Sequence, residues 1–286
     1  MEPPTPLVRL RPLDADLYAK VEYLHPSASI KHRALPAFLA AEMEAGSIAR
    51  GQRIVIQTAG SAGMAVAWSA AVLGLRATVV VPEVATLQVV RTIRWLGAEC
   101  HQLADDEMAV MMRRLAVEPR VRVLDQASEA RLIDYYRPIA AEILADCPSA
   151  TAITVGIGSG LSLTGIGREL KARGGSCRVV GVEPAEAAVA SGKPWAPHSL
   201  IGLAPPIPQP LLDRSVLSEI VTVASRDAWQ CARDVYRRAG LPVGPSAGAA
   251  IRAAMMLRER GVEGPLVAVC ASSISEFIER APTLAS

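Results

Sequence analysis

Lysine is scarce in this sequence: of the 30 basic residues among 286, only four are lysine and the rest are arginine. Aromatic residues make up only 4% of the chain, and the formal net charge is +2. With 30 basic and 28 acidic residues, the chain lacks the excess of positive charge that binds nucleic acid through its phosphates. A hydrophobic content of 51% is enough to bury a large core, which excludes intrinsic disorder.

Long hydrophobic runs and paired cysteines are also missing. The longest apolar stretch, residues 62–75, contains Ser69 and Gly74, whereas a membrane-spanning helix needs roughly 20 apolar residues. The N-terminal sequence MEPPTPLVRLRPLD has no apolar signal core. The five cysteines form no CxxC pair, so we expect reduced thiols, mostly in the core, and no metal site. These absences predict a cytoplasmic protein without a membrane partner.

Short β-branched runs alternate with segments of helical length along the chain. This alternation is typical of an α/β fold with parallel sheets covered on both faces. One stretch without clear periodicity, residues 184–210, carries seven of the 21 prolines, and we expect it to border the active site. The expected strands are residues 19–24, 53–57, 77–81, 99–103, 122–125, 152–156, 178–182, 219–223 and 266–270. The expected helices are residues 31–45, 62–75, 86–96, 106–116, 137–145, 163–173, 226–238 and 246–260.

Lys31 lies in HPSASIKHR, a serine-rich turn that enters a predicted helix. A lysine amine can lose its proton and attack a carbonyl group, whereas a guanidinium stays protonated. In a chain that uses so few lysines, this position is a candidate for covalent catalysis. The alternative is a solvated residue in the first turn of a helix.

Two further segments carry the residue types of anion sites. TAGSAG, residues 58–63, links a strand to a helix, and small residues there let backbone N–H groups approach an anion. An ordinary turn with Ser61 as N-cap is the alternative. VGIGSGLSLTGIG, residues 155–167, also follows a strand and opens a helix, which predicts a phosphate site. It does not fit GxGxxG, although Glu183 ends the next strand and keeps a nicotinamide cofactor open as an alternative.

A last segment, VGPSAGAA at residues 243–250, starts the final long helix, and Ser246 is a candidate N-cap there. In this order the segments resemble the cysteine synthase and cystathionine β-synthase family, which are pyridoxal-phosphate enzymes of fold type II. The resemblance covers nearly the whole chain. It rests on TPLVRL, KVEYLHPSASIKHR, QTAGSAGMAVAWSAAVLGLRATVVVPE, Gln126, GIGSGLSLTGIGRELK, VVGVEP, HSLIGLAPPIP and GPSAGAA.

The resemblance implies two open αβα lobes with mostly parallel sheets, like the tryptophan synthase β-subunit, and a cofactor in the cleft between them. The smaller domain, which carries the substrate-carboxylate loop, would be residues 36–130. The larger domain, which binds the cofactor phosphate, would comprise residues 1–35 and 131–286. A homodimer is the habit of the family.

The resemblance also assigns residues to pyridoxal 5'-phosphate and to substrate. Lys31 would hold the cofactor as an internal aldimine and then shuttle protons. A neutral hydroxyl at Ser246 would face the pyridine nitrogen and would not hold the ring protonated, which makes the ring a milder electron sink. The other cofactor residues would be Gly158, Ser159, Gly160, Ser162 and Ser61. The substrate would meet Thr58, Ala59, Gly60, Ser61, Ala62 and Gln126.

The implied reaction is β-replacement on an activated L-serine-type amino acid, through an α-aminoacrylate that a nucleophile captures. β-Elimination, as in serine and threonine dehydratases, is the alternative within the same class. A catalytically degenerate homologue that binds a ligand or a partner is the alternative outside it.

Several positions depart from the family pattern. Ser61 replaces an asparagine that reaches the cofactor ring hydroxyl, and Leu161 replaces a phosphate-loop glycine. His32 replaces the aspartate that usually follows the lysine. We expect His32 to be a surface residue at a helix start, with a second acid/base group beside Lys31 as the alternative. Because the serine side chain at position 61 is shorter than that of asparagine, we expect a specialised substrate and not the usual substrate of the family.

Overall fold

In a computed structural model the chain is described over residues 3–282, and these residues form two compact units. The small unit is His25–Leu132. The large unit comprises residues 3–24 and 133–282, so the small unit is inserted in the chain of the large one. The domain boundaries expected at 36 and 130 stay a prediction.

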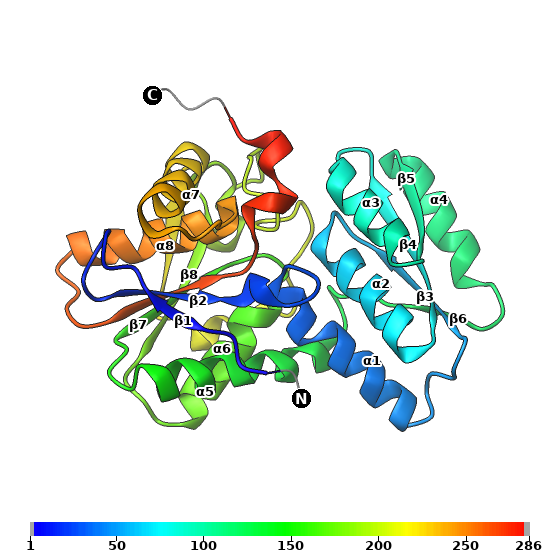
Figure 1. The fold of residues 1–286 in the computed structure, drawn as a ribbon, viewed down its shortest axis with the longest axis horizontal. Coiled ribbons are helices and arrows are strands. Elements are labelled where there is room, and N and C mark those ends of the chain that lie inside the picture. The colour runs from blue at the N-terminus through cyan, green and yellow to red at the C-terminus, as the bar shows by residue number, and fades with distance from the viewer. Residues whose placement is uncertain (1–2, 283–286) are drawn as a thin grey trace. The chain divides into compact units, whose positions relative to one another are not determined.

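The small unit is built on a four-stranded, fully parallel sheet with the order β5-β4-β3-β6. Figure 1 shows its helices on both faces of the sheet. The strands are β3 (Arg53–Gln57), β4 (Arg76–Pro82), β5 (Glu99–Leu103) and β6 (Val121–Val123). The helices are α1 (Leu35–Glu44), α2 (Ser61–Leu73), α3 (Leu87–Trp95) and α4 (Asp105–Ala116).

The central strand β4 is buried on both faces, which explains its continuous apolar sequence. Successive side chains of a strand point to opposite faces. Val80 therefore packs with Met108 of α4, while Val79 lies beneath α2. A Cβ at Gly63 of α2 would come within 2.6 Å of Val79 Cγ1, so glycine is needed for α2 to approach the sheet this closely.

The large unit is built on a six-stranded sheet with the order β1-β2-β10-β7-β8-β9. All neighbouring pairs are parallel except β1 with β2. The strands are β1 (Leu7–Arg9), β2 (Leu17–Val21), β7 (Ala152–Gly156), β8 (Arg178–Pro184), β9 (Glu219–Val223) and β10 (Leu266–Cys270). The helices are α5 (Arg137–Asp146), α6 (Leu161–Ala172), α7 (Ser225–Ala239) and α8 (Pro245–Glu259).

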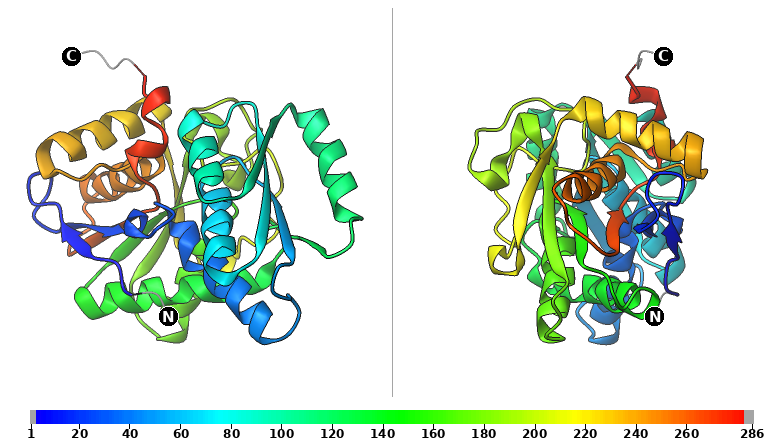
Figure 2. Two further views of the ribbon diagram at one scale, coloured as in Figure 1. Left: turned by 45° about the vertical axis from the view of Figure 1, so that its right-hand side comes forward. Right: turned by 90° about the vertical axis from the view of Figure 1, so that its left-hand side faces the viewer.

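Helices cover both faces of this sheet as well (Figures 1 and 2). The main core lies on the α7 and α8 face, where alternate residues such as Val180 and Val182 of β8 join Ala250 of α8. Gly181 points to the other face, and a Cβ there would meet Ile157 and Leu163 within 3.4 Å. The parallel strands between the two helix layers place the start of each following helix at one edge of the sheet, where ligands bind in α/β folds.

Most strands match their predicted bounds, and two differences have clear causes. The helix expected at residues 31–45 is a 3-10 turn, Ile30–Arg33, followed by α1. Pro36 has no N–H to donate to the residue 32 carbonyl, so one continuous helix cannot form. The antiparallel strand β1 was missed because it has only three residues. No helix among residues 3–282 is long and apolar enough to cross a membrane.

Candidate active site

The four lysines have different environments, and only one of them is a candidate nucleophile. Lys20 has no exposed surface, and its Nζ donates to Thr5 O at 2.6 Å and to Glu142 Oε2 at 2.5 Å. Lys171 and Lys193 are exposed. Lys31 is half-buried, and burial lowers the pKa of its amine to about 8. Lys31 is thus not held as a solvated surface ammonium.

A tight turn presents Lys31 at the start of the 3-10 segment. Ser29 is its N-cap, and the Ser29 hydroxyl accepts a hydrogen bond from Lys31 N at 3.3 Å. The preceding Ala28 has a φ of 51°, in the left-handed region that non-glycine residues seldom occupy. The serine-rich sequence is therefore explained in part by the turn itself, which fixes the backbone at Lys31.

The prediction of a surface position for His32 is wrong. Its side chain has no exposed area. The ring stacks on His25 with centroids 5.3 Å apart and meets the edge of Trp68 at 4.5 Å. His32 points into the small unit because the 3-10 turn places adjacent side chains on different sides. It packs beneath the turn that carries Lys31.

The TAGSAG segment forms the predicted link between β3 and α2. Thr58 is buried, and its Oγ1 accepts from Gly60 N at 3.3 Å, so this hydroxyl braces the loop. Gly60 is the N-cap of α2, and Ser61 is the first helical residue, so the alternative of a turn with Ser61 as N-cap is wrong. Among the described residues no side chain caps this helix start. Its first N–H groups and the positive end of its dipole suit a carboxylate.

The predicted substrate positions in this loop differ in how far their side chains are exposed. Ala59 is exposed, while Gly60 and Ser61 are half-buried at the helix start. The methyl group of Ala62 is buried, so only its backbone N–H is suited to a ligand. The binding capacity of this loop therefore lies in its backbone more than in its side chains.

Gln126 lies in a turn after β6, and the side chain of Asp125 stabilises this turn. Asp125 accepts from Ala127 N at 2.9 Å and from Ser128 Oγ at 2.7 Å. The Gln126 Oε1 atom is buried and accepts no hydrogen bond from any residue in 3–282. A buried carbonyl without a donor costs roughly 1–3 kcal/mol, which suits a position that meets a ligand donor.

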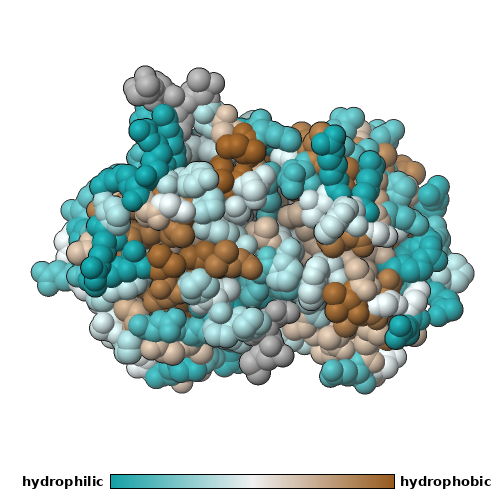
Figure 3. Space-filling model, viewed as in Figure 1, coloured by the Kyte–Doolittle hydropathy of each residue, from teal (hydrophilic) through white to brown (hydrophobic). Residues whose placement is uncertain are grey.

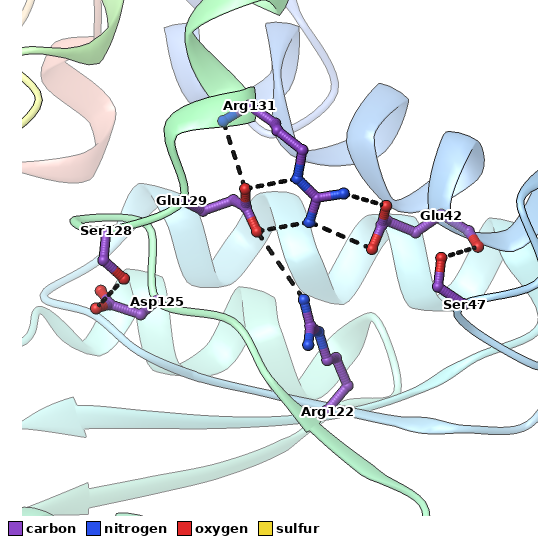
Figure 4. A network of polar contacts seen from close by, with 7 residues as sticks. All are labelled: Glu42, Ser47, Arg122, Asp125, Ser128, Glu129 and Arg131. Carbon is purple, nitrogen blue, oxygen red and sulfur yellow. Dashed lines mark hydrogen bonds and ion pairs between the residues drawn. The ribbon is translucent and has the colours of Figure 1, made fainter.

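A polar network ties this turn to α1 (Figure 4). Arg131 donates to Glu42 Oε1 at 2.6 Å and to both carboxylate oxygens of Glu129 at 2.8 Å. Its guanidinium also lies 4.9 Å from the centroid of the Phe38 ring. The hydrogen bonds from Arg131 lower the pKa of the Glu129 carboxyl below its ordinary value. The network fixes the segment that follows Gln126.

The predicted phosphate loop follows β7 and needs glycine at two positions. A Cβ at Gly158 would lie 2.4 Å from the carbonyl oxygen of Gly202. Gly160 has a φ of +87°, is the N-cap of α6, and would place a Cβ 2.8 Å from Leu212 Cα. The proline-rich stretch that includes Gly202 thus packs against this loop, and its place at the border of an active site stays a prediction.

The start of α6 has the donors that a phosphate requires. No side chain of the described residues caps this helix. Ser159 and Ser162 are half-buried, and neither hydroxyl bonds to another described side chain. Thr164, in contrast, donates to Leu211 O and accepts from Asp213 N, both at 2.9 Å, so it braces the loop. Unused N–H and O–H groups at the positive end of a helix fit the phosphate of pyridoxal phosphate.

Ser246 is the second residue of α8, and Gly244 is the N-cap, which corrects the prediction of Ser246 as the cap. The Ser246 hydroxyl lies 3.0 Å from Ser272 Oγ, and both residues are buried. Ser272 follows β10 and is not among the residues predicted for the site. The sequence signal that could have pointed to Ser272 is the pair of serines, Ser272 and Ser273, that follows the buried strand β10.

Glu183 does not support the nicotinamide alternative. Its buried carboxylate accepts from Ala190 N at 2.8 Å and from Ser191 N and Oγ at 3.1 and 2.5 Å. These bonds hold the chain after β8 and leave the carboxylate occupied. The described residues also contain no cluster of three or more His, Cys, Asp or Glu side chains that could hold a metal ion.

Comparisons with known proteins agree with this arrangement. A family model described as "Pyridoxal-phosphate dependent enzyme" matches residues 1–272. O-ureido-L-serine synthase of Streptomyces lavendulae is 33% identical over 92% of this chain and 84% of its own. Cysteine synthase 3 of Caenorhabditis elegans is 32% identical over 95% of this chain and 85% of its own.

Solved structures give the same result for the fold. The crystal structure of an O-ureido-L-serine synthase has a TM-score of 0.90 at 29% identity and covers 99% of this chain and 94% of its own. Cysteine synthase from Entamoeba histolytica has a TM-score of 0.89 at 23% identity, over 99% of this chain and 89% of its own. The predicted fold class is confirmed.

Proposed function

Because this chain belongs to the family of pyridoxal-phosphate dependent enzymes, we propose that it catalyses β-replacement on an activated L-serine-type amino acid, with the cofactor on Lys31. The observation that carries the proposal is the partial burial of Lys31 and the lowered pKa of its amine. It is the one half-buried lysine, and its pKa is lowered to about 8. A neutral amine is the form that attacks a carbonyl group.

The cofactor, when bound, supplies the electron sink that weakens bonds at the α-carbon of an attached amino acid. The chain supplies the remaining functions. Lys31 Nζ holds the cofactor and afterwards takes and returns a proton. The N–H groups at the start of α2 bind the substrate carboxylate, and Gln126 Oε1 accepts a hydrogen bond from the substrate. Gly158, Ser159, Gly160 and Ser162 hold the phosphate, and Ser246 faces the pyridine nitrogen.

We propose a specialised substrate. Ser61 is one group shorter than the asparagine usual in the family, so it loses a contact with the cofactor ring. A nucleophile or leaving group that makes contacts of its own compensates by binding away from the reacting carbon. The relative named O-ureido-L-serine synthase supports this proposal, because its named product carries an oxygen-linked substituent on serine.

Borohydride reduction tests the cofactor linkage. The purified protein is expected to be yellow, to lose its visible absorbance on reduction, and to carry the cofactor on the Lys31 peptide in mass spectra. Lys31→Ala removes this signal, and Lys193→Ala, at an exposed lysine, is the matched control that keeps it. A reducible linkage that survives in Lys31→Ala contradicts the proposal.

Kinetics across a panel of activated serines and nucleophiles test the reaction and its specificity. We expect low efficiency with O-acetyl-L-serine and sulfide, and higher efficiency with a larger nucleophile. Ser61→Asn then shifts selectivity toward sulfide or clashes and lowers all activity. High efficiency of the unmodified protein with O-acetyl-L-serine and sulfide identifies a common cysteine synthase instead. Pyruvate as the sole product identifies β-elimination. A protein that carries the cofactor on Lys31 but turns over no substrate is the catalytically degenerate homologue.

We further propose a cytoplasmic homodimer with the cofactor in a cleft between domains 36–130 and 1–35 plus 131–286. The cysteines of the described chain are all free, in keeping with a reducing compartment. On the face in Figure 3 hydrophobic side chains gather in several groups separated by hydrophilic ones. Exposed Trp95 and Tyr236 are examples of large apolar side chains left open to a second copy. Sedimentation of the purified protein tests the dimer.

A further inference from the structure

Two serine hydroxyls from distant parts of the large unit meet at the start of α8. Ser246 Oγ lies 3.0 Å from Ser272 Oγ. The two residues are 6% and 5% exposed, so both hydroxyls lie in a largely buried environment. Neither hydroxyl forms another hydrogen bond with a described residue. This bond is therefore the one interaction within residues 3–282 that sets the orientation of either proton.

The backbone around Ser272 is shaped to permit this contact. Gly244 N donates to Ser272 O at 2.9 Å. A Cβ at Gly244 would lie 2.7 Å from Ser272 Oγ and 3.0 Å from Ser273 O, so glycine leaves the space that the hydroxyl occupies. The neighbouring Ser273 has a different task, because its Oγ donates to Pro242 O at 3.1 Å. Ser273 braces the turn, whereas Ser272 addresses Ser246.

The direction of donation determines what Ser246 offers to a ligand. A hydroxyl has one proton and two acceptor sites. If Ser272 donates, Ser246 keeps its own proton and is a donor toward a ring nitrogen. If Ser246 donates its proton to Ser272 Oγ, it can only accept a hydrogen bond from the ring nitrogen. Ser246 then favours a protonated ring nitrogen. The positive end of the α8 dipole disfavours a protonated nitrogen beside Ser246, so the first direction is the favourable one.

We propose that Ser272 is a positioning residue that donates its proton to Ser246 Oγ and so directs the Ser246 hydroxyl, as a donor, to the pyridine nitrogen of pyridoxal phosphate. The inference rests on the proposed function. It adds to that function a residue that holds the ring nitrogen in its neutral state. Ser272 acts through Ser246 and does not itself touch the cofactor.

The test uses holoenzyme reconstituted with pyridoxal phosphate labelled with ¹⁵N in the ring. In the unmodified protein the ring-nitrogen resonance is expected at the position of a neutral, hydrogen-bonded pyridine. Ser272→Ala frees the Ser246 hydroxyl to accept, so the resonance moves toward the protonated position and cofactor affinity falls about fivefold, the effect of one ordinary hydrogen bond. Ser272→Cys keeps the volume and a weak donor, and it moves the resonance less.

Ser273→Ala is the matched control: it removes a neighbouring hydroxyl and leaves the resonance unchanged. In the Ser246→Ala background, Ser272→Ala has no further effect, because its target is gone. A merely structural role would add its effect in both backgrounds. An unmoved resonance in Ser272→Ala and in Ser272→Cys overturns the inference while leaving the proposed function intact. Absence of a Lys31-linked cofactor in the unmodified protein overturns the proposed function, and the inference with it.

Discussion

At the scale of single residues, the ionisation of Lys31 has a measurable consequence. Burial lowers the pKa of its amine to about 8, whereas an ordinary lysine amine has a pKa of about 10.4. The neutral fraction at pH 7 is then roughly a tenth, about two hundred times larger than for an ordinary lysine. Lys31 can therefore react as a nucleophile near neutral pH.

We predict that Lys31 in the cofactor-free protein reacts with an acylating reagent with a midpoint near pH 8. The rate rises with pH because deprotonation creates the reactive form. Peptide mass spectrometry measures the extent of reaction at each pH. The urea-unfolded protein is the control, and its midpoint moves up to about 10.4 because burial is lost. Equal midpoints in the two states would show that the folded environment does not perturb Lys31.

A second residue-scale prediction concerns the close approach at Gly158. A methyl group there would lie 2.4 Å from the backbone carbonyl oxygen of Gly202, which is not the end of a flexible side chain. Gly158→Ala is expected to displace the loop, lower cofactor affinity more than tenfold and cost roughly 1–3 kcal/mol in the free energy of unfolding. Cofactor titration and urea denaturation measure the two effects.

Gly175→Ala is the matched control, since a Cβ there meets nothing within 4 Å. It is expected to leave cofactor affinity unchanged. If Gly158→Ala binds the cofactor as tightly as Gly175→Ala does, the phosphate lies elsewhere.

At the scale of elements, the Arg131 network connects α1 to the turn that carries Gln126. Arg131→Ala removes the guanidinium between Glu42 and Glu129. We expect the KM for the amino-acid substrate to rise about three- to tenfold with a smaller change in kcat, because the loosened turn no longer holds Gln126 in place. Arg122→Ala is the control, since its contact with Glu129 is 3.9 Å long and a weak effect is expected.

The same network predicts a pH dependence of stability. Arg131 lowers the pKa of the Glu129 carboxyl in the folded state, so the contribution is present above the unfolded value of about 4.3. It is lost as the pH falls through the lowered folded value. The difference in Tm between the unmodified protein and Arg131→Ala should therefore be constant near neutral pH and vanish in acid. A difference that persists below the folded pKa would point to packing on Phe38 instead.

The sequence predicted the elements better than it predicted the directions of side chains. Runs such as ATVVVP identify buried parallel strands, because β-branched apolar residues bounded by turns have few alternatives. The burial of His32 was not predictable, since it depends on a 3-10 turn that Pro36 imposes. The pairing of Ser246 with Ser272 was equally hidden, because it joins a helix start to the end of a strand 26 positions away.

At the scale of the whole molecule, the ion pair of fully buried Lys20 and half-buried Glu142 joins β2 to α5 within the large unit. We predict that Glu142→Gln lowers the free energy of unfolding by roughly 3–5 kcal/mol, because a fully buried ammonium loses its counter-charge. Urea denaturation measures the loss. Lys20→Met combined with Glu142→Leu is the control and should recover most of the stability, since it removes both charges. If the single and double variants are equally unstable, packing and not charge is responsible.

The position of β10 in the large sheet also sets an order in time. Leu17 of β2 pairs with Leu266 of β10, the last strand within residues 3–282, and β10 also pairs with β7 on its other side. A ribosome adding about 5–20 residues per second needs roughly 10–50 s to pass from one partner to the other. The small unit is contiguous in sequence and can complete its sheet during that interval. Strand β2 is synthesised long before its parallel neighbour β10, so the yield of native protein should depend on translation speed and on the chaperones that shield nascent chains.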